Sequence, residues 1–132
     1  MPHATEHRQA VFKDGSATCM ARVVGAAAEP ITRSMLTSAR YTVSLIDPQD
    51  EDADTPIEHH EAETLTISEV VFDALQVDDL WTADEGGYNF KHVIDVLTYQ
   101  AFAIAGREYR VTYALTPTIG QVIIVRFRLK VI

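Results

Sequence analysis

The chain has 132 residues and a formal net charge of −8 at pH 7, and this length fits one folding unit of roughly 100–200 residues. Hydrophobic residues make up 47% of it, which allows a packed core and excludes a disordered chain. The acidic balance excludes a general nucleic-acid binder, because phosphate contacts need a concentrated cationic surface. The apolar runs are too short for a membrane-spanning helix of about 20 residues.

The single cysteine, Cys19, cannot form an internal disulfide, so folding needs no oxidising compartment. The N-terminal residues also lack the charged-then-apolar order of a secretory signal. We therefore expect synthesis in the cytoplasm. Strand-like neighbours surround Cys19, and we interpret it as a small, buried apolar residue.

The first half of the chain reads as strands separated by turns. Residues 1–12 lack clear periodicity and are expected to form an N-terminal arm or an edge strand. After a turn at 13–16, residues 17–24 read as a strand. Residues 40–46 alternate between apolar and polar side chains, which is typical of a half-buried strand. The following residues, 47–63, are rich in carboxylates and are predicted to form an acidic loop.

One short helix is predicted over residues 66–76. Thr66 and Glu69 stand three residues apart, as in a capping box that satisfies the free donors of a first helical turn. Apolar residues then recur at helical spacing, namely Ile67, Val70, Val71, Ala74 and Leu75. We expect this helix to lie over one end of the sheet layers.

Period-two segments return at residues 88–95, 106–113 and 121–132. In the last of these, one face carries Val125, Phe127, Leu129 and Val131, and the other carries Arg126, Arg128 and Lys130. Short strands with frequent turn signals predict a single, mainly β domain built as an antiparallel sandwich. The predicted core residues are Tyr41, Val43, Trp81, Tyr88, Phe90, Tyr109 and Phe127.

The run Gly106-x-x-Tyr109-x-Val111, with a turn and a closing alternating strand after it, resembles the end of an immunoglobulin-like sandwich. There, a tyrosine opening the penultimate strand hydrogen-bonds back across the corner. Together with Trp81 and Gly87-Tyr88-Asn89-Phe90, the second half is similar to small immunoglobulin-like proteins of phage tails, baseplates and head decorations. The paired cysteines of a typical immunoglobulin domain are missing. The resemblance implies an immunoglobulin-like β-sandwich that is associated with a virion.

The acidic segment contains calcium candidates. Asp50, Asp52, Asp54 and Glu61 occupy positions one, three, five and twelve of the spacing found in a helix-flanked calcium loop. However, Thr55 stands where the tight turn requires glycine, and the preceding segment reads as a strand. We expect a solvated acidic loop, with no metal and no cofactor bound.

No catalytic constellation is expected. Adjacent histidines in an extended loop point apart, so His59 and His60 are predicted to be surface residues whose protonation near pH 6 would reduce the loop's charge. The sequence has no Gly-x-Ser-x-Gly elbow and no glycine-rich phosphate loop, and Cys19 has no histidine near it in sequence. We therefore expect a protein without enzymatic activity.

The basic face of the last strand has two interpretations. Arg126, Arg128 and Lys130 either discourage unwanted strand addition or contact the acidic loop of a neighbouring copy. Two functions stay open. The first is a structural or accessory component of a phage particle, whose partner is a copy of itself or a multimeric scaffold. The second is a small-ligand or carbohydrate-binding module that uses the loops at the Trp81 end.

Overall fold

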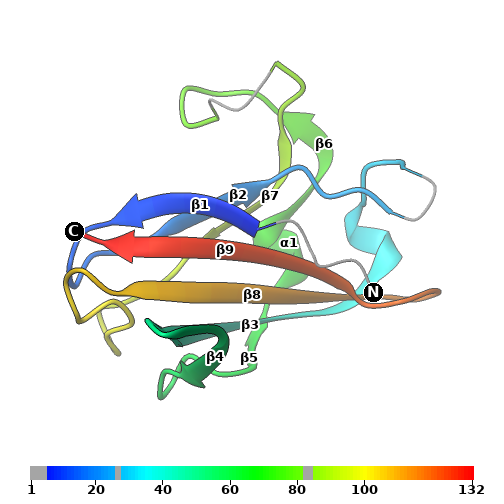
Figure 1. The fold of residues 1–132 in the computed structure, drawn as a ribbon. Coiled ribbons are helices and arrows are strands. Elements are labelled where there is room, and N and C mark those ends of the chain that lie inside the picture. The colour runs from blue at the N-terminus through cyan, green and yellow to red at the C-terminus, as the bar shows by residue number, and fades with distance from the viewer. Residues whose placement is uncertain (1–5, 26–27, 82–84) are drawn as a thin grey trace.

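The computed structural model describes residues 6–25, 28–81 and 85–132, which form two stacked β-sheets (Figure 1). The larger sheet has six strands in the order β1-β9-β8-β3-β4, with β5 also paired to β3. Its strands are β1 (Glu6–Val11), β3 (Leu36–Asp47), β4 (Asp50–Pro56), β5 (Glu63–Leu65), β8 (Glu108–Pro117) and β9 (Ile123–Val131). Each pair in this sheet is antiparallel except β1 with β9, which is parallel.

The smaller sheet has three antiparallel strands in the order β2-β7-β6. They are β2 (Thr18–Ala21), β7 (Tyr88–Val93) and β6 (Val71–Gln76). A short 3-10 segment, η1 (Arg33–Met35), precedes β3, and one helical turn, α1 (Ile67–Val70), leads into β6. The prediction of a mainly β fold with antiparallel sheets and a short helix is confirmed. No helix in the described part of the chain is long and apolar enough to cross a membrane.

The core lies between the two sheets and follows the alternation of the strands. On β8 and β9, the residues that face the smaller sheet are buried, among them Tyr109, Val111, Tyr113, Phe127 and Leu129. Burying each of these large side chains contributes about 1.5–3 kcal/mol, so the last two strands supply much of the core's stabilisation.

Six of the seven predicted core residues are buried: Tyr41, Val43, Tyr88, Phe90, Tyr109 and Phe127. Trp81 is the exception and corrects the prediction, since it is only partly buried. Its ring centroid lies 5.7 Å from that of Tyr88, which packs edge-on against Phe72 at 5.8 Å. These three rings form a satellite cluster outside the main core, because Trp81 follows the end of β6 and does not lie between the sheets.

Tyr109 makes a hydrogen bond back to the backbone before β8, as the resemblance implies for a tyrosine corner. The backbone N–H of Ile104 donates to the hydroxyl oxygen of Tyr109 over 3.3 Å, back across the connection that enters β8. Gly106 supplies the left-handed turn at φ +82 between them. The Tyr109 ring also packs edge-on against Phe102, with centroids 5.4 Å apart. The corner thus anchors the long β7–β8 connection to the core.

The predicted helix over 66–76 is wrong beyond its first turn. Only Ile67–Val70 is helical, and residues 71–76 form β6. The side chain of Thr66 caps no backbone donor. Val71 is instead fully buried opposite Phe90 of β7, so pairing with β7 overrides the helical spacing. The β-branched pair Val70 and Val71 favours that outcome.

Residues 1–12 were expected to form an arm or an edge strand, and residues 6–11 form the edge strand β1 in parallel register with β9, while residues 1–5 lie outside the described residues. The prediction of an acidic loop over 47–63 needs correction, because this segment contains strand β4 and reaches the first residue of β5, and both strands pair with β3. A two-residue connection between Asp47 and Asp50 allows β4 to fold back as a hairpin.

Candidate functional site

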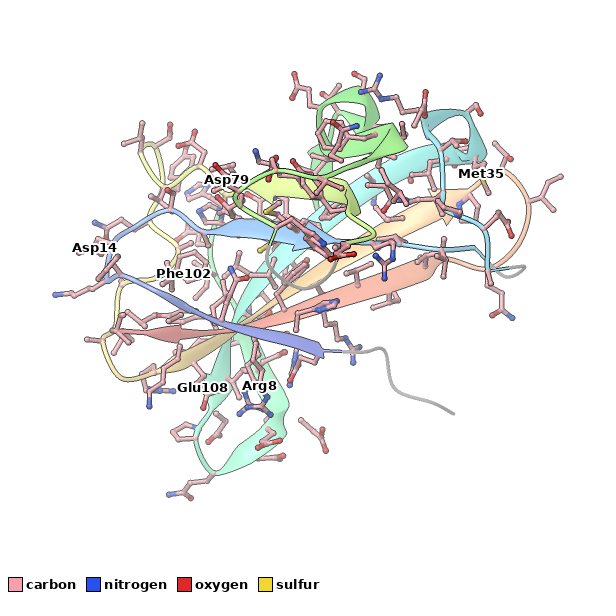
Figure 2. The ribbon with its side chains drawn as sticks, turned by 90° about the horizontal axis from the view of Figure 1, so that it is seen from above. Arg8, Asp14, Met35, Asp79, Phe102 and Glu108 are labelled. Atoms are coloured by element: carbon pink, nitrogen blue, oxygen red, sulfur yellow. The ribbon has the colours of Figure 1, made fainter. Side chains whose placement is uncertain are left out.

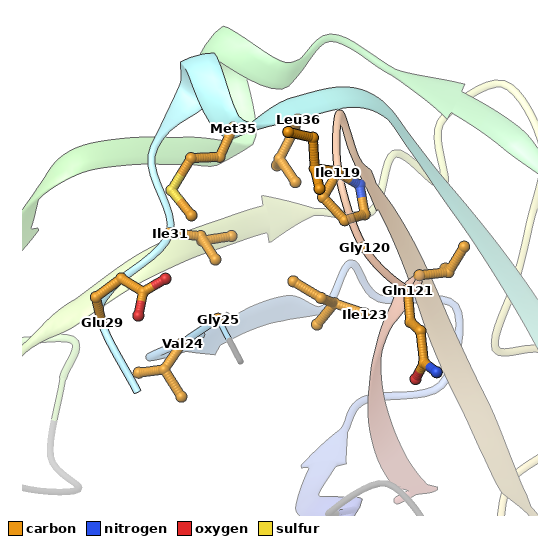
Figure 3. Close-up of a pocket in the computed structure, with 12 residues that line it drawn as sticks. Val24, Gly25, Glu29, Ile31, Met35, Leu36, Ile119, Gly120, Gln121 and Ile123 are labelled. Atoms are coloured by element: carbon orange, nitrogen blue, oxygen red, sulfur yellow. The ribbon is translucent and has the colours of Figure 1, made fainter. Parts of the chain in front are cut away.

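A pocket of about 540 Å³ opens at one end of the sandwich, between the turn joining β8 to β9, the start of β3 and the segment after β2 (Figure 3). This volume lies within the roughly 300–1,000 Å³ of typical ligand sites. Its walls are mostly apolar, with side chains from Val24, Ile31, Met35, Leu36, Ile119 and Ile123. The polar side chains that line it, Glu29 and Gln121, are exposed.

One wall of the pocket is fixed by Asn89, a buried residue of β7. The backbone N–H of Val23 donates to Asn89 Oδ1 over 2.7 Å, and Asn89 Nδ2 donates to the carbonyl of Val23 over 2.9 Å and to that of Ile31 over 3.3 Å. A bridge between Val24 and Pro30 closes the same segment. Asn89 therefore holds the pocket wall against the smaller sheet, a role the sequence alone did not indicate.

The rim of the pocket takes exposed apolar side chains from both walls, Ile119 and Val122 from the turn between β8 and β9 and Val24 from the segment held by Asn89. Ile119 is 90% exposed, Val122 49% and Val24 45%. The turn that presents Ile119 is held by the N–H of Thr118, which donates to the carbonyl of Met35 over 2.9 Å. Clustered, exposed apolar side chains around a hollow are typical of an interaction site. We call Val24, Ile119 and Val122 the apolar rim.

A second exposed apolar side chain stands at the other end of the molecule. Phe12 is 74% exposed and opens a tight turn in which Gly15 N–H donates to the Phe12 carbonyl over 2.8 Å. The N–H of Asp14 in this turn donates to the carbonyl of Phe102 over 2.8 Å. Figure 2 shows Asp14 and Phe102 at one end of the sandwich and Met35, which lines the pocket, at the other.

The basic residues of β9, for which a contact with a neighbouring copy was one of two interpretations, differ in their exposure and partners. Arg128 is only 7% exposed, and its Nε donates to Glu108. Its Nη1 lies 3.4 Å from Glu51 Oε2. Burial alone would lower the pKa of Arg128, but the hydrogen bonds and charges of Glu108 and Glu51 outweigh it, and the net shift is upward. Lys130 remains exposed, and Arg126 is half-buried, with an Nε that has no hydrogen-bond partner among the described residues.

Carboxylates of the acidic strand β4 form ion pairs with arginines on the outward face of β8 and β9 in the same molecule. Arg110 Nε lies 2.9 Å from Glu6 Oε2, and its Nη1 lies 3.1 Å from Asp54 Oδ2. With Glu51 beside Arg128, the acidic segment thus contacts arginines of β8 and β9 within one molecule. The sequence carried a signal for these ion pairs. Arg110 and Arg128 stand on outward positions of two consecutive strands that lie side by side, and two neighbouring guanidinium groups need carboxylates close to them.

The calcium candidates are not assembled into a site. Asp54 is engaged by Arg110, and the N–H of Asp52 donates to Asp50 Oδ1 over 3.1 Å. Glu61 lies beyond the end of β4 on the next connection. Over residues 6–25, 28–81 and 85–132, no group of three or more His, Cys, Asp or Glu side chains is placed to hold a metal ion.

The prediction of two surface histidines is wrong for His60, which is 2% exposed. Its Nε2 lies 2.8 Å from the carbonyl oxygen of Tyr99, and its Nδ1 lies 2.8 Å from the hydroxyl of Tyr41. A carbonyl only accepts, so Nε2 carries the proton and Nδ1 accepts from Tyr41. His59 stays exposed and stacks on the Tyr99 ring at 3.7 Å. Both histidines therefore hold the connection between β7 and β8 in place through their contacts with Tyr99.

Cys19 lies directly opposite His92 on neighbouring strands, a pairing invisible in the sequence. Burial raises the pKa of the Cys19 thiol to about 12, although a hydrogen bond with Tyr113 acts in the other direction. Burial is the main cause that lowers the pKa of His92 to about 4, and its Nδ1 lies 2.8 Å from the Tyr113 hydroxyl. A nucleophilic cysteine needs an accessible thiolate, so this pair is structural. The interpretation of Cys19 as a buried residue is confirmed.

No protein-family model matches the chain, and the searches of curated proteins and of solved structures find no significant match.

Proposed function

We propose that this protein is a non-enzymatic structural or accessory component that acts through protein–protein contacts, with copies of itself as its principal partner. The observation that carries the proposal is the apolar rim around the pocket. Ile119, Val122 and Val24 are exposed to water. A protein partner that covers them would gain a binding free energy of about 25 cal/mol for each Å² of apolar surface removed from water.

The strand order supports an immunoglobulin-like form of the sandwich. If β2, β7 and β6 are taken as strands B, E and D, and β9, β8 and β3 as G, F and C, both sheets have the order of that fold, with β4 in the place of the added strand beside C. The Tyr109 corner stands at the start of the strand where immunoglobulin domains carry theirs. With the resemblance in the second half of the sequence, this makes a phage particle the expected setting.

The alternative is a small-ligand or carbohydrate-binding module. The pocket volume favours it. However, ligand sites fix their ligands with a few convergent polar groups, and here the polar side chains in the lining, Glu29 and Gln121, are both exposed. Trp81 is accessible at the far end of β6, but its ring packs on Tyr88. We therefore place ligand binding second.

Light scattering of the purified protein at low and high salt tests the proposal. We expect an oligomer whose mass rises with protein concentration and persists in high salt, because the contact is mainly apolar and Asp54, Glu51 and Arg128 form their ion pairs within the chain. A monomer at every concentration and salt level would contradict self-association and leave the ligand-binding alternative.

A further inference from the structure

We propose that copies of this protein associate head to tail, with the Phe12 turn of one copy seated in the apolar pocket of the next. The proposal rests on the function proposed above and names the two surfaces that meet. We call residues 12–15 the Phe12 turn.

The Phe12 turn is built to present its aromatic ring. The carbonyl of Phe12 accepts from Gly15 N–H over 2.8 Å, and the N–H of Asp14 donates to Phe102 over 2.8 Å. The N–H of Lys13 also donates to the carbonyl of Ile132 over 3.0 Å. Asp14 holds the left-handed conformation at φ 60 that this turn requires. The backbone is therefore fixed before any contact forms, and a rigid, exposed aromatic side chain binds with little loss of entropy.

The pocket fits the ring in size and chemistry. A phenylalanine side chain buries about 150–250 Å² of surface when it is enclosed. A pocket of about 540 Å³ with walls of Val24, Ile31 and Ile123 has room for the ring and for part of its turn. Aromatic anchors in apolar pockets are the usual centres of protein interfaces.

Charge complementarity points to the same partner. Lys13 follows Phe12 directly and is exposed, and Glu29 stands exposed at the pocket. The proposed contact pairs the ammonium group of Lys13 with the Glu29 carboxylate at the mouth of the pocket. A pair of this kind at the rim sets orientation more than affinity.

The placement of the two surfaces defines the symmetry. The Phe12 turn and the pocket lie at opposite ends of the sandwich, beside the C-terminal end of β9 and beside the turn that precedes β9, respectively (Figures 1 and 2). An end-to-end contact between them joins two different surfaces, so each pair of copies leaves one turn and one pocket free. The contact is heterologous, so it continues from copy to copy and closes as a ring or extends as a filament.

Two single variants test the proposal. Phe12→Asp removes the anchor and keeps the pocket, whereas Ile119→Asp spoils the pocket and keeps the anchor. Both sites are more than two-thirds exposed, so folding should be unaffected, which unchanged melting temperatures would show. The matched control is Leu97→Asp, because Leu97 is 96% exposed and belongs to neither surface. We expect each test variant to weaken association at least about tenfold, and the control to match the wild type.

Mixing the two variants is the decisive measurement. An equimolar mixture of Phe12→Asp and Ile119→Asp retains one intact anchor and one intact pocket, so light scattering should show dimers that grow no further. Assembly insensitive to both variants, or a mixture that stays monomeric, would overturn the head-to-tail contact while leaving the proposed function standing. A wild type that is monomeric throughout would overturn both.

Discussion

Arg110 and Arg128 lie directly opposite each other on β8 and β9, on the outward face of the larger sheet. Like charges in this position repel, so carboxylates must surround them. Glu6 approaches both guanidinium groups, with Oε2 2.9 Å from Arg110 Nε and Oε1 3.8 Å from Arg128 Nη1. The acidic strand β4 is therefore held onto the sheet by the two arginines, and this explains why a segment of carboxylates folds as a strand.

Replacing Arg128 should destabilise the fold. Arg128→Met leaves Glu108 and Glu51 without their cationic partner, and we expect the free energy of unfolding in urea to fall by about 1–3 kcal/mol. The estimate is below that for a fully buried pair because Glu51 is largely exposed. Lys130→Met on the same face should change it by less than about 0.5 kcal/mol. Equal effects of the two substitutions would refute the network's role.

The tyrosine corner has a modest, measurable contribution. Tyr109→Phe keeps the buried ring and deletes the hydroxyl that accepts from Ile104 N–H, so the free energy of unfolding should fall by about 0.5–1.5 kcal/mol. Tyr99→Phe is the matched control, since Tyr99 is 47% exposed and its ring stacking on His59 survives the change. If Tyr109→Phe is as stable as the wild type, the corner hydrogen bond contributes nothing.

Stability should depend on pH through His92. The folded protein holds the pKa of His92 at about 4, against an ordinary 6.5. Between these values the unfolded chain takes up a proton that the folded chain refuses, so this contribution is complete above about pH 6.5 and is lost as the pH falls toward 4. At about 1.4 kcal/mol per pKa unit, and with a discount for partial exposure, the loss is about 1–3 kcal/mol.

A non-titrating variant isolates this contribution. Thermal melts of the wild type and of His92→Asn between pH 7 and pH 4 should show a shallower decline for the variant, because carboxylates and the other histidines titrate in both proteins. Parallel curves over the whole range would show that burial does not hold His92 neutral.

Cys19 should be chemically silent in the native state. Its thiol is fully buried and its pKa is raised to about 12, so almost no thiolate is present at pH 8. We expect a disulfide reagent such as Ellman's reagent to modify Cys19 only as fast as the protein unfolds, and within the mixing time in denaturant. Rapid modification of the native protein would show that the space between β2 and β8 is open to solvent.

The parts of the fold that were predictable are those encoded by local alternation. Val125, Phe127 and Leu129 alternate with charged residues on β9, so this strand was predictable from spacing alone. The hydrogen bond of Tyr109 at the start of β8 was implied by the resemblance to an immunoglobulin-like sandwich. The errors arose where partners distant in sequence decided the outcome. Residues 71–76 pair with β7, and His60 is buried by contacts with Tyr41 and Tyr99.

The candidate site was not predictable for the same reason. Its two walls come from segments about 90 residues apart in sequence. Asn89, on β7, holds one of these walls through its hydrogen bonds to Val23 and Ile31. In the sequence, Phe12 stood in a segment without clear periodicity, just before a predicted turn, and nothing indicated that its side chain is exposed. Its exposure became visible once the turn was placed against Phe102 and the end of β9.

Hydrogen–deuterium exchange of the wild-type protein at low and high concentration tests the central claim most directly, because it locates the contact without any substitution. We predict that raising the concentration slows exchange in the Phe12 turn and in residues 118–123 beside the pocket, and leaves the β3–β4 hairpin unchanged. Exchange that is independent of concentration everywhere, or protection confined to the β3–β4 hairpin and the charged face of β9, would contradict an association through the apolar end of the sandwich.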